Sequence, residues 1–303
     1  MMLLALAALV PSLFWDSGPK DAQKVKDAGI THVAVPANQL DSWRNVPGLA
    51  VEAGSLDGAV KLITPTVNYR VNQASASRAP WLESNGWHFL RQPDGRFYYD
   101  VKDVQAGLAA AEAFAFGAHA LVKTDDSGLA PLARMQEFLN ALPASGLPPI
   151  ADFGFLDDGT ASTGELMNVM IRHNLLFRRT TAPEPSLPLN VRPDHASAPA
   201  LLVQEIREKL GDDKRSIRIY GSVVVIARLQ AANGNARVHL LNYTAGRNTA
   251  QSIRVRVLGK YPHHSVAASG LDHPELLDFT AASDATEFTL PELKVYAVID
   301  LRQ

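Results

Sequence analysis

The stretch FYYDVKDVQAGLAAAEAFAFGAHALVKTDD, residues 97–126, has the clearest local pattern in the chain. Apolar residues recur at spacings of three and four from Val101 to Ala115, which predicts one buried face of a helix. Asp100 stands where the N-cap of that helix is expected, and Gly117 stands where the helix should stop. The larger part of the stretch is therefore predicted to be a capped helix.

A short apolar run, residues 118–122, follows this helix directly and predicts a buried strand. The strand leads into Asp125 and Asp126. A helix followed by a strand is the repeating unit of α/β folds, in which ligands and catalytic groups usually lie at the carboxyl ends of the strands. We therefore expect an α/β domain with acidic residues at its functional edge.

Strands and helices alternate through residues 12–215. Eight strands are predicted, near residues 12, 32, 49, 60, 87, 120, 150 and 175. Eight strands that are each followed by a helix form a TIM barrel, although this segment is shorter than the ~250 residues of a typical one. A (β/α)8-like, incomplete barrel is the prediction, and a split near residue 149 into a barrel part and a small α/β unit is the alternative.

The hydrophobic period changes from 3.6 to 2 near residue 216. The run SIRVRV at residues 252–257 alternates polar and apolar side chains, as a half-buried antiparallel strand does. Asn233 and Gly234 lie between two predicted strands and indicate a hairpin. Residues 216–303 are therefore predicted to form a separate, small antiparallel β-sandwich.

Composition excludes several classes of function. The chain of 303 residues has 29 basic and 31 acidic residues, a formal net charge of −2, and no basic run, so we expect no nucleic-acid partner. It has no cysteine, which excludes disulfides and thiolate chemistry. The sequence motifs of zinc proteases, serine hydrolases and nucleotide-binding loops are not found, so neither a metal nor a cofactor is predicted.

The first residues are strongly apolar. Residues 2–10, MLLALAALV, have the length of a signal-peptide core but lack a preceding positive charge. The run is too short to span a bilayer, so no membrane partner is expected. We predict that residues 1–11 are a signal remnant of a secreted or periplasmic protein. The alternative is a buried first strand or helix, which would also suit a cytoplasmic protein.

Two passages resemble glycoside hydrolases. AAAEAFAFGAHALVKTD, residues 109–125, looks like a helix-to-strand unit of carbohydrate-active barrels. ARVHLLNYTAG, residues 236–246, and TEFTLPELKVYAVIDL, residues 286–301, are similar to the β domain that closes many such enzymes. The resemblance implies a reduced TIM barrel with a β-sandwich, an oligo- or polysaccharide as partner, and O-glycosyl bond hydrolysis by two carboxylates.

The catalytic positions that the resemblance implies are not matched. The largest clan of glycosidase barrels has a catalytic Glu at the end of the fourth strand and another at the end of the seventh. Here the fourth predicted strand ends in TVNY, residues 66–69, and the seventh ends in Asp157 and Asp158. Three hypotheses stay open: an active hydrolase, a non-catalytic carbohydrate-binding or structural relative that has lost the acid pair, and an incomplete piece of a larger enzyme.

Acidic residues at predicted strand ends are the catalytic candidates, namely Asp125, Asp157 and Asp16. Glycoside hydrolysis needs two carboxyl groups, ~5 Å apart in retaining enzymes and ~6.5–9.5 Å apart in inverting ones. Asp125 and Asp157 are the preferred pair because their strands would be neighbours in a barrel. The alternative role for each of them is a helix N-cap or a turn.

Other side chains near these strand ends are predicted to bind the sugar: Trp15, Glu52, Trp81, Tyr98, Tyr99, Asp126 and Asp158. Aromatic rings suit this role because the C–H faces of sugars stack on them. Core packing is the alternative role for each aromatic residue. For the acidic residues the alternatives are helix capping and solvent exposure.

Overall fold

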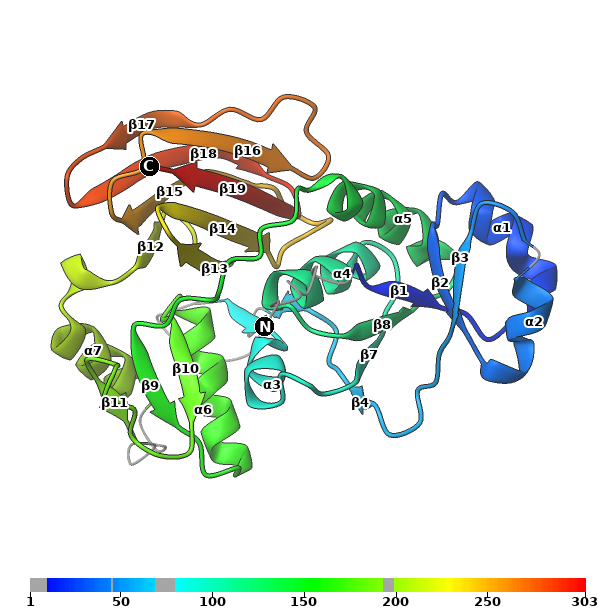
Figure 1. Cartoon of the computed structure of the whole chain (residues 1–303), viewed down its shortest axis with the longest axis horizontal. Coiled ribbons are helices and arrows are strands. Elements are labelled where there is room, and N and C mark those ends of the chain that lie inside the picture. Colours follow the sequence, from blue (N-terminus) through cyan, green and yellow to red (C-terminus); the bar gives the residue numbers. More distant parts are fainter. Residues whose placement is uncertain (1–9, 45, 69–79, 193–198) are drawn as a thin grey trace. The chain divides into compact units, whose positions relative to one another are not determined.

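The computed structural model describes residues 10–44, 46–68, 80–192 and 199–303 (Figure 1). The chain divides into two compact units, each made of two segments. The first unit comprises Met1–Thr66 and Gln92–Gly146, and the second comprises Val67–Arg91 and Leu147–Gln303. Apart from Val10 and Pro11, the predicted signal remnant lies outside the described residues. None of the helices in the described ranges has the length and apolarity needed to cross a bilayer.

The first unit is built on a six-stranded, fully parallel sheet with the order β3-β2-β1-β8-β7-β4. Its strands are β1 (Ser12–Phe14), β2 (His32–Val35), β3 (Ala50–Ala53), β4 (Val60–Lys61), β7 (Phe97–Asp100) and β8 (Ala120–Lys123). Chain order and sheet order agree if the strands are placed on a ring that is opened between β3 and β4. The sheet therefore has the strand order of a barrel, without closure among the described residues.

Helices connect the neighbouring strands of this sheet. The connecting helices are η1 (Pro19–Asp21), α1 (Ala22–Asp27), η2 (Ala37–Gln39), α2 (Leu40–Trp43) and α4 (Gln105–Phe116), and α5 (Asp126–Ala141) follows β8, the last strand of the sheet in the chain. Right-handed crossovers that always step in the same direction place their helices on one face of the sheet. Figure 1 shows α4 and α5 next to each other beside β1 and β8, and both helices contact each other.

The two faces of this sheet differ in character. Side chains on the face toward the helices are apolar and buried, such as Leu13, Val33 and Val122. The other face, which we call the polar face, follows from the strand register and the alternation of side chains. It consists of Ser12, Phe14, His32, Ala34, Ala50, Glu52, Lys61, Tyr98, Asp100, Leu121 and Lys123.

The second unit begins with a two-stranded sheet of β5 (Thr66–Asn68), which spans the boundary, and β6 (Trp81–Glu83). Helix α3 (Gly86–Arg91) follows. A parallel sheet with the order β10-β9-β11 contains β9 (Phe153–Leu156), β10 (Phe177–Thr180) and β11 (Asn190–Val191). Helices α6 (Ala161–Arg172) and α7 (Pro199–Leu210) contact each other, and α6 also contacts α3.

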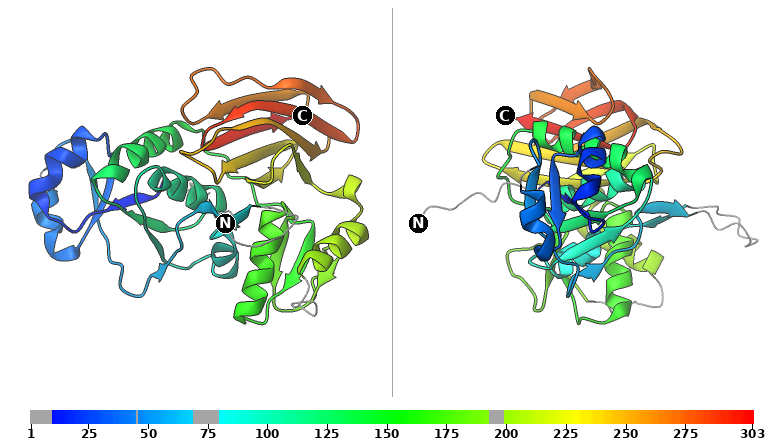
Figure 2. Two further views of the ribbon diagram at one scale, coloured as in Figure 1. Left: turned by 180° about the vertical axis from the view of Figure 1, so that it is seen from behind. Right: turned by 90° about the vertical axis from the view of Figure 1, so that its right-hand side faces the viewer.

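The rest of the second unit is an antiparallel β-sandwich, whose two layers are visible in Figure 2. One sheet has the order β12-β15-β18-β17 and the other β13-β14-β19-β16. The strands are β12 (Ile217–Tyr220), β13 (Val225–Ala232), β14 (Asn235–Asn242), β15 (Ala250–Leu258), β16 (His263–Ala268), β17 (Leu277–Ala281), β18 (Ala285–Leu293) and β19 (Tyr296–Arg302). One apolar core joins both sheets, with Val255 from one and Val238 from the other.

The hairpin predicted at Asn233 and Gly234 is confirmed. The two residues have φ values of 50° and 76° and connect β13 to β14. Two positive φ angles in succession define the tight turn that an Asn-Gly pair favours.

Three predictions of local structure are wrong. The weak strand expected near residue 87 is helix α3, which buries Gly86 and Phe89. Asp100 is not an N-cap, because residues 97–100 form β7 and α4 begins at Gln105. The strands before Asp125 and Asp157 are not neighbours, because β8 and β9 belong to different sheets. A complete eight-stranded barrel is accordingly not confirmed.

Candidate functional site

The carboxyl edge of the six-stranded sheet carries a row of alternating charges, which we call the edge row: Asp16, Lys123, Asp100 and Lys61. Lys123, Asp100 and Lys61 are the last residues of β8, β7 and β4, and Asp16 lies two residues after the end of β1, so the row follows the ends of four successive strands. Lys123 Nζ lies 2.6 Å from Asp16 Oδ2, and Lys61 Nζ lies 3.1 Å from Asp100 Oδ2. The four side chains are between 35% and 58% exposed. The row is therefore open to solvent.

Strand geometry explains the edge row. Asp100 and Lys123 are partners in the parallel register of β7 and β8 and project from the polar face. Exposed ion pairs of this kind each contribute only about 0–1 kcal/mol to stability. Fold stability alone therefore gives little reason for four charged groups at one edge.

An apolar patch lies on the same face, nearer the middle of the strands. Phe14, Ala34 and Leu121 form a small buried cluster, against which Tyr98 and Leu56 pack. Tyr98 is half-buried and is the register partner of Lys61 and Leu121. The edge row thus adjoins an aromatic side chain, as in a site that combines ring stacking with polar contacts.

Glu52 lies on the polar face but belongs to a different feature. Its Oε1 accepts a hydrogen bond of 2.7 Å from Ser12 Oγ. Both residues line a pocket of about 310 Å³ that also includes His32 and His119. Most of the lining residues come from the amino ends of the strands, so this pocket is at the end of the sheet opposite the edge row.

Asp125 and Asp126 occupy the first turn of α5. Asp125 is the N-cap and accepts a hydrogen bond of 3.0 Å from the Ser127 amide. Hydrogen bonds from Ser127 are the main cause that lowers the pKa of Asp125, with a smaller effect from Lys102. Asp126 is exposed and pairs with Lys24 Nζ at 2.7 Å. Both contacts match the helix-capping and surface roles that the sequence left as alternatives.

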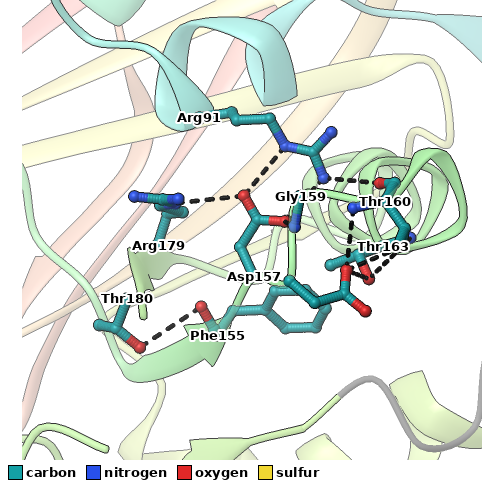
Figure 3. Close-up of polar contacts among 9 residues, drawn as sticks. Arg91, Phe155, Asp157, Gly159, Thr160, Thr163, Arg179 and Thr180 are labelled. Carbon is teal, nitrogen blue, oxygen red and sulfur yellow. Dashed lines mark hydrogen bonds and ion pairs between the residues drawn. The ribbon is translucent and has the colours of Figure 1, made fainter. Parts of the chain in front are cut away.

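Asp157 is buried between two arginines at the carboxyl end of β9 (Figure 3). Its side chain is 0% exposed and accepts hydrogen bonds from Arg91 Nε and Nη2 at 3.0 and 2.7 Å. Arg179 Nε donates at 3.1 Å and the Gly159 amide at 3.0 Å. Arg91 Nη2 also donates to the Thr160 carbonyl at 2.9 Å, which ties α3 to the turn before α6.

The ionisation of Asp157 follows from these contacts. Burial raises the pKa of this carboxyl group, but the hydrogen bonds from Arg91, Gly159 and Arg179 outweigh it and hold the pKa below its ordinary value. Both carboxylate oxygens are occupied by guanidinium donors, so no oxygen faces an open cleft.

Asp158 stabilises the start of α6. Its Oδ1 accepts hydrogen bonds from the Thr163 hydroxyl and from the amide and hydroxyl of Thr160. These bonds lower the pKa of Asp158 to about 2, with Thr163 as the largest cause. Thr160 is the N-cap of α6, and its side chain accepts a hydrogen bond from the Thr163 amide.

The predicted aromatic residues lie in different surroundings. Trp15 is buried on the helix-covered face, where Lys24 Nζ lies 5.0 Å from its ring centroid. Tyr99 is fully buried and its hydroxyl donates to Glu112 Oε2 at 2.7 Å. Trp81 belongs to the second unit and is covered by the Arg172 guanidinium at 3.6 Å. Of the predicted site residues in the first unit, Asp16 belongs to the edge row, and Tyr98 packs against the adjoining apolar patch.

Sequence reasoning missed three members of the edge row: Lys61, Asp100 and Lys123. The run FYYD gave no strand signal for Asp100, because three aromatic residues in succession do not alternate with polar ones, and the alternation appears only in the burial of the folded side chains. The helical pattern that begins at Val101 favoured a helix N-cap at this position instead. Lys61 and Lys123 also stand at strand ends, but only acidic residues at such positions were candidates, because glycoside hydrolysis requires carboxyl groups. In the described ranges no cluster of three or more His, Asp and Glu residues is arranged to hold a metal ion.

Comparison with known proteins identifies the fold. No protein-family model matches the chain, and no curated protein matches it. The α-L-fucosidase isoenzyme 2 from Paenibacillus thiaminolyticus matches with a TM-score of 0.55 and 11% identity, over 88% of this chain and 71% of that one. A GH42 β-galactosidase from G. stearothermophilus gives a TM-score of 0.35 at 9% identity, over 92% of this chain and 61% of that one. The TM-score of 0.55 shows that the chain shares the fold of the fucosidase, a glycoside hydrolase, without a specific family being shown.

Proposed function

We propose that this protein is a glycoside-hydrolase-like protein that binds an oligo- or polysaccharide at the carboxyl edge of its six-stranded sheet. The edge row is the observation that carries the proposal, since polar groups at the carboxyl ends of parallel strands are where α/β folds place their ligands. The fold shared with the fucosidase supports the same class of ligand.

The chemistry of the edge row suits a sugar. Carboxylates accept and ammonium groups donate hydrogen bonds, and sugar hydroxyls can do both. Asp16 and Lys123 present one such donor and acceptor pair, and Asp100 and Lys61 present a second. The half-buried ring of Tyr98 offers a surface on which a sugar C–H face can stack.

The contacts of Asp125 and Asp157 favour the non-catalytic form of this proposal. A glycosidase general acid needs a raised pKa, so that it is still protonated when the leaving oxygen requires the proton. Hydrogen bonds instead lower the pKa of Asp125 and of Asp157. Each carboxylate also has a structural task, as an N-cap in one case and as the partner of two arginines in the other.

Hydrolysis remains a second candidate function because the edge row contains two carboxylates. Strands β1 and β7 are separated only by β8. Neighbouring strands are ~4.8 Å apart, so β7, which ends in Asp100, and β1, which ends two residues before Asp16, are about 10 Å apart. This spacing is close to the ~6.5–9.5 Å between the carboxyl groups of inverting glycosidases.

Calorimetric titration with a panel of oligo- and polysaccharides tests both forms, with reducing-end release measured on the same samples. We expect saturable binding that weakens about tenfold in Asp16→Asn and in Lys123→Met, because each substitution removes a charge-assisted hydrogen bond. Asp126→Asn is the matched control, since Asp126 also pairs with a lysine at 2.7 Å, and should bind like the wild type.

The outcomes separate the alternatives. Saccharide binding without release of reducing ends establishes the non-catalytic protein. Release that is lost in Asp16→Asn and Asp100→Asn, but kept in Asp126→Asn, establishes the hydrolase. The absence of binding to every saccharide would refute the proposed function.

A further inference from the structure

A basic cluster lies in the second unit, remote in sequence from the edge row. Arg172 and His173 stand at the end of α6, and Arg207 lies on α7. Arg215 directly follows η3 (Asp212–Lys214), and Arg218 lies on β12. Figure 1 shows α7 continuing through this short segment into β12. Three parts of the chain thus contribute cationic side chains to one region.

One carboxylate serves two of these arginines. Asp212 Oδ1 lies 2.9 Å from Arg215 Nη1, and Asp212 Oδ2 lies 3.5 Å from Arg218 Nη1. Arg215 also donates from Nη2 to the Asn174 carbonyl at 3.1 Å. The Arg215 side chain is only 5% exposed, whereas Asp212 is 56% exposed. The arginine is therefore held firmly while its acidic partner faces solvent.

Several guanidinium donors in the cluster lack an acceptor. The Nε atoms of Arg207, Arg215 and Arg218 are buried, and within the described part of the chain no hydrogen-bond acceptor reaches them. A buried donor without an acceptor is unfavourable, because it has lost its hydrogen bonds to water without replacement. These three Nε atoms belong to side chains that converge on the same region, so one ligand could satisfy more than one of them.

Positive charge is in excess in this region. Burial, and then the charge of Arg215, lowers the pKa of Arg207 against the opposing effect of Asp212. Desolvation lowers the pKa of His173 to about 4, with further contributions from Arg207, Arg172 and Arg215. The arginines therefore lie close enough to repel other cations.

The second acid near the cluster does little to offset this charge. Asp152 lies close enough to Arg215 for their charges to interact, but burial raises the pKa of its carboxyl group. Its Oδ1 accepts a hydrogen bond from the Ser216 amide at 3.1 Å. Helix dipoles give a partial alternative explanation, since the carbonyl ends of α6 and α7 attract cations. That effect applies to Arg172 and Arg207 but not to Arg218, which lies on β12.

We propose that Arg207, Arg215 and Arg218 form an oxyanion-binding site. Its ligand is a carboxylate, sulfate or phosphate group, because the guanidinium fork presents parallel N–H donors that match the oxygens of such groups. The oxyanion is either a free ion or the acidic substituent of a saccharide. Asp212 competes with this ligand for Arg215 and Arg218. The site is independent of the edge row and does not require the proposed function.

The test is isothermal titration at constant ionic strength with sodium sulfate and sodium phosphate, and separately with a sulfated disaccharide and its unsulfated counterpart. We expect one saturable site for the anions. Arg207→Gln and Arg218→Gln should each weaken it about tenfold, the loss expected for a charge-assisted hydrogen bond. Arg254→Gln is the control, because Arg254 is an exposed arginine paired with Glu287 on another part of the sandwich.

Asp212→Asn should change the affinity for the anion in the opposite direction, which a misfolded variant would not do. Removing the competing carboxylate should tighten anion binding several-fold. Tighter binding of the sulfated than of the unsulfated disaccharide would identify a saccharide substituent as the source of the oxyanion, and equal weak binding of both would identify the free ion. The proposal is overturned if no anion binds saturably, if Arg254→Gln weakens binding as much as Arg218→Gln does, or if Asp212→Asn weakens it.

Discussion

At the scale of single residues, Asp157 shows how one position in the sequence can suit two very different roles. It directly follows an apolar strand, as a catalytic carboxylate in an α/β fold does. Its surroundings are nevertheless those of a buried ion pair, because Arg91 and Arg179 come from α3 and β10 to meet it. Sequence alone could not show this, since the two arginines lie 66 and 22 positions away.

Asp157→Asn should strongly destabilise the protein. Removing one partner of a buried ion pair leaves the remaining charge uncompensated and costs about 3–5 kcal/mol. Urea denaturation at pH 7 measures the loss. Asp126→Asn is the control and should change the free energy of unfolding by at most about 0.5 kcal/mol, because Asp126 is exposed.

Comparison of the wild type with Asp157→Asn also tests how the free energy of unfolding depends on pH. The pKa of Asp157 is lower in the folded protein than the ~3.9 of an unfolded aspartate, so the folded state binds fewer protons. Its contribution to stability is therefore present above about pH 4 and is lost as the pH falls through the folded pKa. The difference between the wild type and Asp157→Asn should shrink as the pH falls below about 4. A constant difference would contradict the role of the ionised carboxylate.

At the scale of elements, the helices and strands with strong periodicity were predictable. The end of α4 at Gly117, which has φ 66°, follows from the need for a left-handed residue. The hairpin at Asn233 and Gly234 follows from similar turn chemistry. Prediction failed where two periods meet, at residues 97–104, and where a short helix is rich in aromatic residues, as in α3. In both cases tertiary contacts decide between two local structures.

The contact between α3 and α6 depends on a glycine. A Cβ atom added at Gly164 would lie 2.7 Å from the Trp87 ring. Gly164→Ala gains about 1 kcal/mol of helix propensity, but overpacking against the ring costs about 1–3 kcal/mol. We expect a net loss of stability in thermal unfolding. Glu165 on the same helix is exposed, so Glu165→Ala should change the thermal stability little. An equal loss of stability in both variants would show that the Trp87 ring is not the cause.

At the scale of the whole molecule, neither compact unit is continuous in sequence. The segment Val67–Arg91 belongs to the second unit although the first unit surrounds it in the chain. The sequence suggested a boundary near residue 149 but gave no sign of this exchange, because the contacts of α3 join residues far apart. The strands of the sandwich were predictable because their period of 2 is regular, but the sandwich belongs to the same compact unit as residues 147–215. The barrel was less predictable, because its closure would require pairing between β3 and β4, which are the two outer strands of the sheet.

A fragment of residues 147–303 should therefore fold incompletely. It retains the sandwich core but lacks Arg91, which pairs with Asp157, and Ser84, whose Oγ lies 3.1 Å from the Tyr243 hydroxyl. In hydrogen–deuterium exchange we expect β14 and β15 to keep the protection that they have in the full chain, while α6 and β9 exchange faster. Equal protection of α6 in both proteins would show that α3 does not stabilise this unit.

The opening of the six-stranded sheet between β3 and β4 has a consequence for solubility. The outermost strand of a sheet offers unpaired backbone groups to which another polypeptide can add, and such addition leads to aggregation. β4 has only two residues, one of which is Lys61, and β3 has four, including Glu52. Short length and a charged side chain are the two features with which natural proteins discourage strand addition. The open sheet thus carries at each margin a safeguard that a closed barrel would not need.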